Sequence, residues 1–153
     1  VAPHLTEQLI AKLNYTPIDL AALVAALASM EGVGDREIFV RRAAAVEERF
    51  IANFTRRQAE LLAAAYRKHG GFVRFVSLAD HPFVLMRDGR IITLAPVDAM
   101  SWTAPVAAGW AEMTAARKQV SAKAKGVILV TGQATPLAKR KLAAEGWGVL
   151  EHQ

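Results

Sequence analysis

The sequence predicts an α+β fold, with a helical N-terminal half packed on a small mixed β-sheet. Residues 1–70 carry apolar side chains at helical spacing almost throughout, whereas residues 71–153 contain short runs rich in β-branched and aromatic residues. An Asp-Gly hairpin signal lies between two of these runs, and a strand–helix–strand pattern closes the chain. Because no linker separates the two halves, we expect a single domain over residues 1–153.

The composition agrees with a folded chain and excludes several classes of protein. The chain has 153 residues, of which 53% are hydrophobic and 22% are charged, so it can bury a core and does not have the composition of a disordered segment. The absence of cysteine excludes disulfide scaffolds, thiolate zinc sites and cysteine nucleophiles. Alanine is abundant, in a composition of bacterial type that indicates closely packed helices.

Two helices are expected at the start of the chain. Thr6 and Glu7 open the first, which Asn14 can close. The run 16–19, Thr-Pro-Ile-Asp, predicts the start of the second, with a hydroxyl N-cap, a proline in the first turn and an acid near the helix N-terminus. This helix extends to about Met30 and is apolar on nearly every side, which predicts either a central position in the core or an interface with a partner.

Two further helices complete the helical half. Asp35 is expected to cap the third, and the pair Thr55 and Gln58 has the pattern of a capping box for the fourth. The sequence leaves open whether these two helices join, and Gly70-Gly71 ends the helical half. The third helix is expected to bury one apolar stripe, formed by Phe39, Ala43, Val46, Phe50 and Phe54.

The second half begins with strands. Phe72–Leu78 has strand composition, and the runs Phe83–Met86 and Ile91–Leu94 flank a turn at residues 87–90 that contains Asp-Gly. A helix is then expected over Pro105–Gln119, where Thr103 is a plausible N-cap.

The last segment has the pattern of a parallel βαβ unit. Residues 126–130 are continuously apolar, as expected of a strand buried on both faces, and residues 131–134 turn the chain. Thr135-Pro136 starts a helix that ends at Gly146, and Trp147–Leu150 forms a further strand.

The turn between this strand and this helix is the best candidate for an anion site. Exposed amides at such a position can bind phosphate or carboxylate, and nearby hydroxyl and basic side chains can assist. A simpler interpretation is that Gly132 only makes the turn and Thr135 only caps the helix, since no GxGxxG or Walker lysine is present. The candidate residues are Thr131, Gly132, Gln133, Thr135, Lys139 and Arg140.

The net charge of +5 lies entirely in the last quarter of the chain. Residues 1–116 contain 12 basic and 12 acidic residues, whereas residues 117–153 contain seven basic and two acidic residues. Such a basic region can bind nucleic acid, an anionic membrane surface or an acidic partner. Aromatic residues do not alternate with the basic ones, so the single-strand binding pattern is incomplete.

Three other residues are polar candidates. Asp98 is positioned after a hairpin and is a possible general base, although an aspartate there more often organises a turn with Trp102 packed beneath it. Glu48 lies close in register to the apolar stripe, which predicts partial burial. Because His4, His69, His81 and His152 share no ligand spacing, we expect neither a metal site nor a cofactor.

These patterns favour a non-catalytic module that recognises a protein partner or a small anionic ligand, within a larger cell-envelope or cytoplasmic assembly. One alternative is a nucleic-acid-binding domain that uses the basic C-terminal quarter, with a remote nuclease-like architecture. A second is a hydrolase that uses Asp98 or Glu48 as its catalytic acid.

The compartment stays open between the cytoplasm and the periplasm or exterior. The most apolar stretch, Pro17–Met30, is too short for a membrane span, so we expect no transmembrane protein. The chain begins at Val1 and not at methionine, which predicts that a removed export signal or a longer protein precedes it.

Overall fold

The computed structural model describes residues 3–11 and 14–153 and confirms the α+β fold. Val1 lies outside the described residues. The helices are α1 (Pro3–Ile10), α2 (Pro17–Ser29), α3 (Glu37–Ala44), α4 (Arg49–His69), α5 (Ala104–Val120) and α6 (Pro136–Ala144). The strands are β1 (Phe72–Leu78), β2 (His81–Met86), β3 (Ile91–Ala95), β4 (Ala99–Met100), β5 (Gly126–Val130), β6 (Gln133–Ala134) and β7 (Trp147–Leu150).

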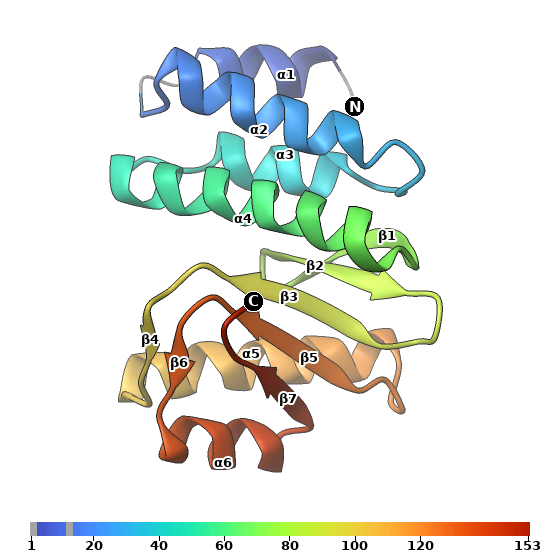
Figure 1. Ribbon diagram of the computed structural model, residues 1–153, viewed down its shortest axis with the longest axis vertical. Coiled ribbons are helices and arrows are strands. Elements are labelled where there is room, and N and C mark those ends of the chain that lie inside the picture. The colour runs from blue at the N-terminus through green and yellow to red at the C-terminus, as the bar shows by residue number, and fades with distance from the viewer. Residues whose placement is uncertain (1–2, 12–13) are drawn as a thin grey trace.

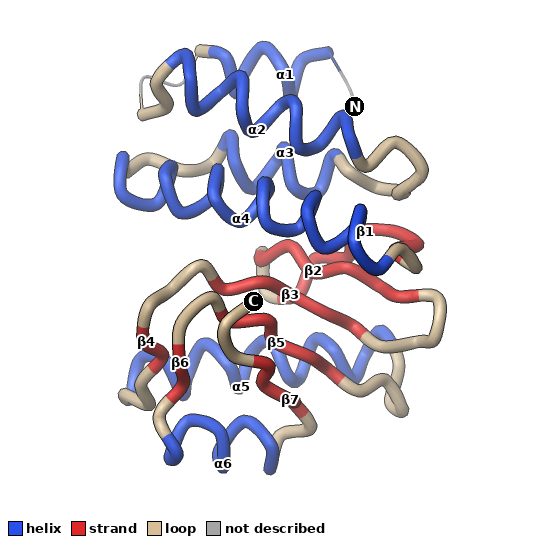
Figure 2. The backbone as a smooth tube through the Cα atoms, in the orientation of Figure 1, coloured by secondary structure: helices blue, strands red, loops and turns tan. Residues whose placement is uncertain are grey.

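The main sheet is mixed, with the strand order β1-β2-β3-β5-β7. The first three strands form an antiparallel meander, and β5 and β7 are each parallel to the neighbour that precedes them in this order. The predicted hairpin and the predicted parallel βαβ unit are therefore confirmed. The sequence analysis did not predict β4 and β6, which form a separate parallel pair beside the main sheet (Figure 2).

The molecule is built in layers (Figure 1). Helices α1 and α2 lie over α3 and α4, which cover one face of the sheet, while α5 and α6 lie on the other side. Alternate strand residues enter two apolar clusters, so Phe75 and Leu94 join the helical half whereas Phe83 and Ile128 pack with α5 and α6. The outer strands of the sheet are β1 and β7, and Gly34 pairs with the outer edge of β1 through an isolated bridge to Arg74.

The N-cap residues predicted from the sequence mark the starts of several helices correctly. Thr16 Oγ1 accepts a hydrogen bond from Asp19 N (3.1 Å) at the start of α2, and Thr135 Oγ1 accepts from Ala138 N (3.1 Å) at the start of α6. The first helix is different from its prediction, since α1 begins at Pro3 and ends at Ile10. Asn14 does not close it, because its side-chain amide donates to Val46 O (3.3 Å) across the helical layer.

The junction between α3 and α4 corrects three predictions. Arg36 and not Asp35 occupies the N-cap of α3, and Asp35 has a positive φ of 56°. The helices do not join: α3 ends at Ala44 and α4 starts at Arg49, which changes the register of the predicted stripe. Phe50 is therefore 77% exposed instead of buried, while Phe39 is fully buried. Thr55 lies well inside α4, so it does not cap a fourth helix.

No helix in the described ranges is both long and apolar enough to pass through a bilayer. The apolar helix α2 packs mainly against α4 and turns one side to solvent, where Ile18 is 81% exposed and Val24 is 45% exposed. Part of the apolar surface predicted for this helix is thus left without a partner in the described chain.

Candidate functional site

A hollow lies where β3 ends, at the edge of the sheet that we call the carboxyl edge. It is a cavity of about 600 Å³ between the N-terminal half of α4, the start of β2, the end of β3 and α5. Ligands of sheets with parallel strands commonly bind outside the carboxyl ends of those strands. Its lining is mostly apolar and includes Phe50, Phe54, Phe83, Val97, Trp110 and Met113.

The cavity exists because β2 and β3 separate toward this edge. Their register pairs are Val84 with Ile92 and Leu85 with Ile91, and the pairing does not continue to Thr93. Pro82 has no N–H to donate to β3, and the remaining link is the Thr93 hydroxyl, which donates to Pro82 O over 3.4 Å. A proline at the start of β2 thus opens the space that the cavity occupies.

Helix α4 satisfies the strand end that this separation leaves without a partner. The Gln58 side-chain amide donates to Leu94 O (2.9 Å), and both residues are buried. Thr55 Oγ1 donates to Ile51 O (2.7 Å) inside the helix. The two residues that suggested a capping box therefore have different roles: Gln58 satisfies a buried strand carbonyl group at the cavity wall, whereas the Thr55 hydroxyl bonds within its own helix.

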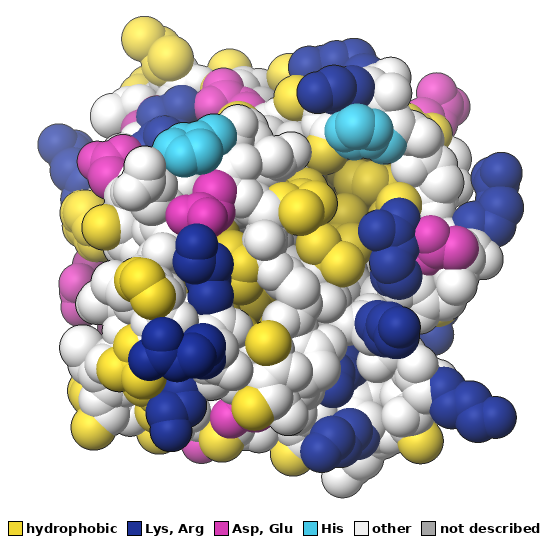
Figure 3. Space-filling model, turned by 60° about the horizontal axis from the view of Figure 1, so that its bottom comes forward, with side chains coloured by type: hydrophobic (Ala, Val, Ile, Leu, Met, Phe, Trp, Pro, Cys, Tyr) yellow, Lys and Arg dark blue, Asp and Glu magenta, His cyan; other side chains and the backbone are white. Residues whose placement is uncertain are grey.

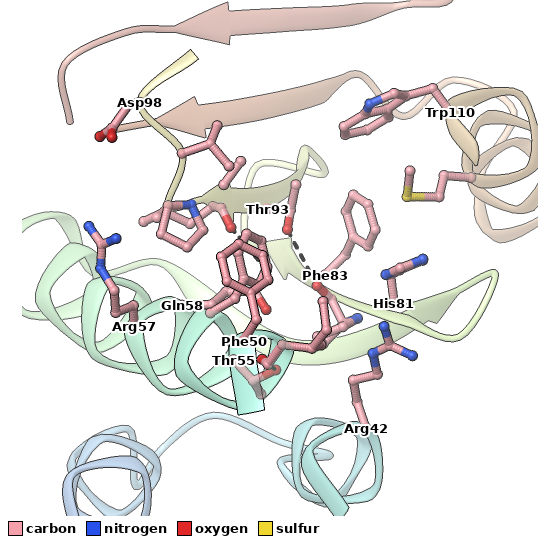
Figure 4. A pocket seen from close by; sticks show the side chains of 18 residues that line it. Arg42, Phe50, Thr55, Arg57, Gln58, His81, Phe83, Thr93, Asp98 and Trp110 are labelled. Atoms are coloured by element: carbon pink, nitrogen blue, oxygen red, sulfur yellow. Dashed lines mark hydrogen bonds between the residues drawn. The ribbon is translucent and has the colours of Figure 1, made fainter. Parts of the chain in front are cut away.

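Charged side chains stand at two ends of the cavity. Figure 4 shows Arg57 and Asp98 at one end and Arg42 and His81 at the other, with Phe50 between them. No carboxylate of a described residue lies within ion-pair distance of the Arg42 or Arg57 guanidinium. Their positive charges are thus available to a bound molecule.

The environment of His81 favours its neutral form. Burial lowers the pKa of the His81 imidazole from its ordinary value, and the positive charge of Arg42 lowers it further. The nearby carboxylates of Asp80 and Glu112 act in the opposite direction with smaller effect. At neutral pH, this ring can therefore donate or accept a hydrogen bond at the wall of the cavity.

The predicted anion turn lies at the same edge, but its amides bond within the chain. Gly132 N donates to Val97 O (2.8 Å), Gln133 N to Asp98 O (3.0 Å) and Thr135 N to Met100 O (2.9 Å). Thr131 Oγ1 donates to Val97 O (3.0 Å). These bonds attach the turn to the segment that follows β3, and anion binding at this turn stays a prediction.

A carboxylate of the chain itself is bound beside this turn. Glu151 accepts from Ala134 N (3.0 Å) and from Lys139 Nζ (2.9 Å). The hydrogen bond from Lys139, which has the larger effect, and the one from Ala134 N hold the pKa of the Glu151 carboxyl below its usual range. Arg140 lies on the exposed surface of α6 and does not line the cavity.

The three polar candidates are not brought together. Asp98 lies at the rim of the cavity, whereas Trp102 is half-buried and packs with the apolar cluster under the sheet. Glu48 is exposed at the N-cap of α4, so its predicted partial burial is wrong, and it does not line the cavity. The reason is the break between α3 and α4, which removes Glu48 from the apolar stripe.

Arg117 is one of the seven basic residues of the C-terminal quarter, but it is buried (4% exposed). Its guanidinium donates to Glu145 O (2.8 Å) and Gly146 O (3.0 Å) and lies 4.6 Å from the centre of the Trp147 ring. This arrangement supports the end of α6 and the start of β7, so the charge of Arg117 does not contribute to a surface.

Sequence reasoning did not identify Arg42, Arg57, His81 and Gln58 as residues of one site. Arg42 and Arg57 have no motif around them in the sequence, and Gln58 had the spacing of a capping box. A proline at the start of a predicted strand was the one local signal that the sheet opens there. The described residues contain no group of three or more His, Asp or Glu side chains placed to hold a metal ion.

Comparison with known proteins finds no family model, no curated protein and no solved structure that matches this chain.

Proposed function

We propose that this protein is a binding module for a small organic anion with an apolar body, which it takes into the cavity at the carboxyl edge. The observation that carries the proposal is a largely apolar cavity of about 600 Å³ with Arg42 and Arg57 at its rim, neither paired with a carboxylate of the described chain. Cavities of this size that combine an apolar lining with a few placed polar groups are typical ligand sites.

The chemistry of the lining defines the class of ligand. The aromatic and aliphatic side chains would contact a hydrocarbon or ring of the ligand, and a guanidinium would bind its carboxylate, sulfonate or phosphate group through paired N–H donors. The Asp98 carboxylate, at the same end of the cavity as Arg57, would disfavour a second negative group of the ligand at that end. It would accept a hydrogen bond from an uncharged polar group of the ligand instead. We therefore expect a ligand with one anionic end.

The placement of the acids favours binding over hydrolysis. Asp98 lines the cavity, whereas Glu48 does not, so the two acids named as catalytic candidates do not face a common space. General acid–base chemistry on a bound molecule needs its groups within hydrogen-bond reach of the reacting atoms.

A titration with the fluorescent sulfonate 8-anilinonaphthalene-1-sulfonate tests the proposal, because this probe combines an aromatic body with one negative charge. We expect saturable binding that octanoate displaces and that 1-octanol displaces at least tenfold less well. The double variant Arg42→Gln/Arg57→Gln should bind the probe at least tenfold more weakly, since even one lost charged hydrogen bond is worth about 1.5–3 kcal/mol. Ala95→Leu should also weaken binding, because it fills part of the cavity.

Arg140→Gln/Lys141→Gln is the matched control, since it removes two exposed charges from side chains that do not line the cavity. Circular dichroism must show that every variant is folded, because the probe also binds partly unfolded chains. Equal displacement by octanoate and octanol, or unchanged affinity in the double variant, would show that the arginines do not recognise an anion.

A second proposal, self-association through α2, is supported by an exposed apolar stripe. Ile18 and Val24 are 81% and 45% exposed, and Ala21, Ala25 and Ala28 between and beyond them are exposed too. We expect light scattering to report a dimer that Ile18→Gln converts to a monomer. A monomer for the unchanged protein would contradict this proposal.

A further inference from the structure

Three segments meet at the opposite, amino edge of the sheet, where β3 and β5 begin. Arg87 N donates to Gly71 O (2.8 Å), which joins the β2–β3 turn to the end of α4. Ile91 N donates to Lys125 O (2.9 Å), which joins the same turn to the connection between α5 and β5. We call the surface formed by segments 67–71, 87–91 and 118–126 the amino-edge surface.

The amino-edge surface concentrates positive charge. It contains seven basic side chains and one acidic one, so its net charge of +6 exceeds the +5 of the whole chain and the rest of the chain has a net charge of −1. All seven basic residues are exposed. They are Arg67, Lys68, Arg87, Arg90, Lys118, Lys123 and Lys125.

Helix stability explains only part of this cluster. Arg67, Lys68 and Lys118 lie in the last turns of α4 and α5, where basic residues interact favourably with the helix dipole. Arg87, Lys123 and Lys125 lie outside helices, so that effect does not account for them. No carboxylate of a described residue is within ion-pair distance of these three side chains, whereas Arg90 is paired with Asp88 (2.8 Å).

A hollow of about 370 Å³ opens beside this charge. Its floor is formed by strand residues, among them Met86, Ile92, Val127 and Leu129, and Arg87 and Arg90 contribute to its lining. Figure 3 shows such a hollow, with hydrophobic side chains on its floor and with a histidine and neighbouring basic and acidic side chains at its rim. The hollow forms because α4 packs on β3, whereas β5 and β7 lie farther from this helix.

The shape of the hollow distinguishes between two polyanionic partners. A protein that binds an anionic bilayer presents apolar side chains that protrude into the lipid, whereas these apolar side chains are recessed below the basic rim. A single nucleic-acid strand fits better, since its phosphates can contact the rim while an unstacked base enters the hollow. A duplex keeps its bases stacked and cannot use the hollow in this way.

We propose that the amino-edge surface binds single-stranded nucleic acid, through phosphate contacts from Arg87, Lys123 and Lys125 and insertion of a base over the apolar floor. This activity is separate from the proposed small-anion site, which lies at the other edge of the sheet.

Fluorescence anisotropy with a fluorescein-labelled 12-nucleotide oligothymidine tests the proposal between 50 and 200 mM salt. The variant Arg87→Gln/Lys123→Gln/Lys125→Gln should bind at least tenfold more weakly at 50 mM salt. Its slope of log affinity against log salt should be smaller by about 2, since each phosphate contact to a single strand contributes about 0.7. An abasic strand of equal length should bind the unchanged protein about tenfold more weakly, because base contacts are worth about 1–3 kcal/mol each.

The control variant Arg41→Gln/Arg140→Gln/Lys141→Gln removes the same charge from exposed positions elsewhere and should retain most of the affinity. The proposal is overturned if the protein does not bind the oligonucleotide at 50 mM salt, or if both triple variants weaken binding equally. Equal affinity for the abasic strand overturns the insertion of a base. Binding to phosphatidylserine vesicles without binding to the oligonucleotide would identify a membrane surface instead.

Discussion

Replacement of Gly132 by alanine tests the close approach that joins the β5–α6 turn to the segment after β3. A Cβ atom at residue 132 would overlap the backbone carbonyl group of Asp98, and a backbone neighbour cannot rotate away as a side chain can. Two hydrogen bonds connect the two segments here, from Gly132 N to Val97 O and from Gln133 N to Asp98 O. The substitution must therefore push the two segments apart.

The expected cost follows from these two effects. Overpacking in a close-packed site costs about 1–3 kcal/mol, and each hydrogen bond that is stretched or lost contributes about 1 kcal/mol. We expect Gly132→Ala to lower the free energy of unfolding by about 3 kcal/mol, which for a domain of this size lowers Tm by roughly 6–12 °C. Because Val97 and Asp98 also line the cavity, binding of the sulfonate probe should weaken in the same variant.

Urea unfolding followed by circular dichroism measures the effect, and Gly109→Ala is the matched control. Residue 109 lies inside α5, and a Cβ atom there would meet no neighbour within 4 Å beyond the backbone of its own helix. Alanine at this position should therefore stabilise the protein by about 0.5–1 kcal/mol. A Gly132→Ala protein within about 0.5 kcal/mol of the unchanged protein would refute the reasoning, since the close approach would then carry no energetic weight.

Three other predictions concern Tyr15, His81 and Arg117. Burial raises the pKa of Tyr15 to about 12, so the free energy of unfolding should fall by about 1.4 kcal/mol per pH unit between pH 10 and 12. Urea titrations of Tyr15→Phe should show no such fall. Because the pKa of His81 is lowered in the folded state, its contribution to the free energy of unfolding is complete above about pH 6.5 and is lost as the pH falls through the folded-state pKa. In His81→Gln, the free energy of unfolding should therefore decrease less steeply as the pH falls. An unchanged decrease would contradict this prediction. Arg117→Met should cost about 3 kcal/mol because two hydrogen bonds from a charged donor are lost, whereas exposed Lys118→Met should cost less than about 0.5 kcal/mol by the same urea assay.

Local signals in the sequence predicted the elements well wherever the interaction is itself local. The capping hydroxyls of Thr16 and Thr135 bond to amides three residues away, and Gly70 and Gly71 adopt positive φ values of 64° and 77° where α4 ends. The Asp-Gly turn at residue 88 likewise forms the hairpin between β2 and β3. Each of these depends on a few neighbouring residues, which the sequence displays directly.

The errors arise where the partner of a residue is distant in sequence. Gln58 has the spacing of a capping box, yet its side chain bonds to Leu94 O, 36 residues away. Phe50 continues an apolar stripe in the sequence, yet a break of the helix turns it to solvent at the mouth of the cavity. A periodic pattern assumes one uninterrupted helix, so it cannot report such a change of register.

The sequence by itself determined the α+β class, most helix and strand positions and the concentration of positive charge near the C-terminus, because these depend on composition and short-range spacing. The tertiary structure decided which of these charges are exposed and where on the fold they lie. It buried Arg117, paired Lys139 with Glu151, and attached the segment that contains Lys123 and Lys125 to the start of β3, just after the turn that contains Arg87. Strand order places residues distant in sequence at one edge of a sheet, and that order depends on packing over the whole fold.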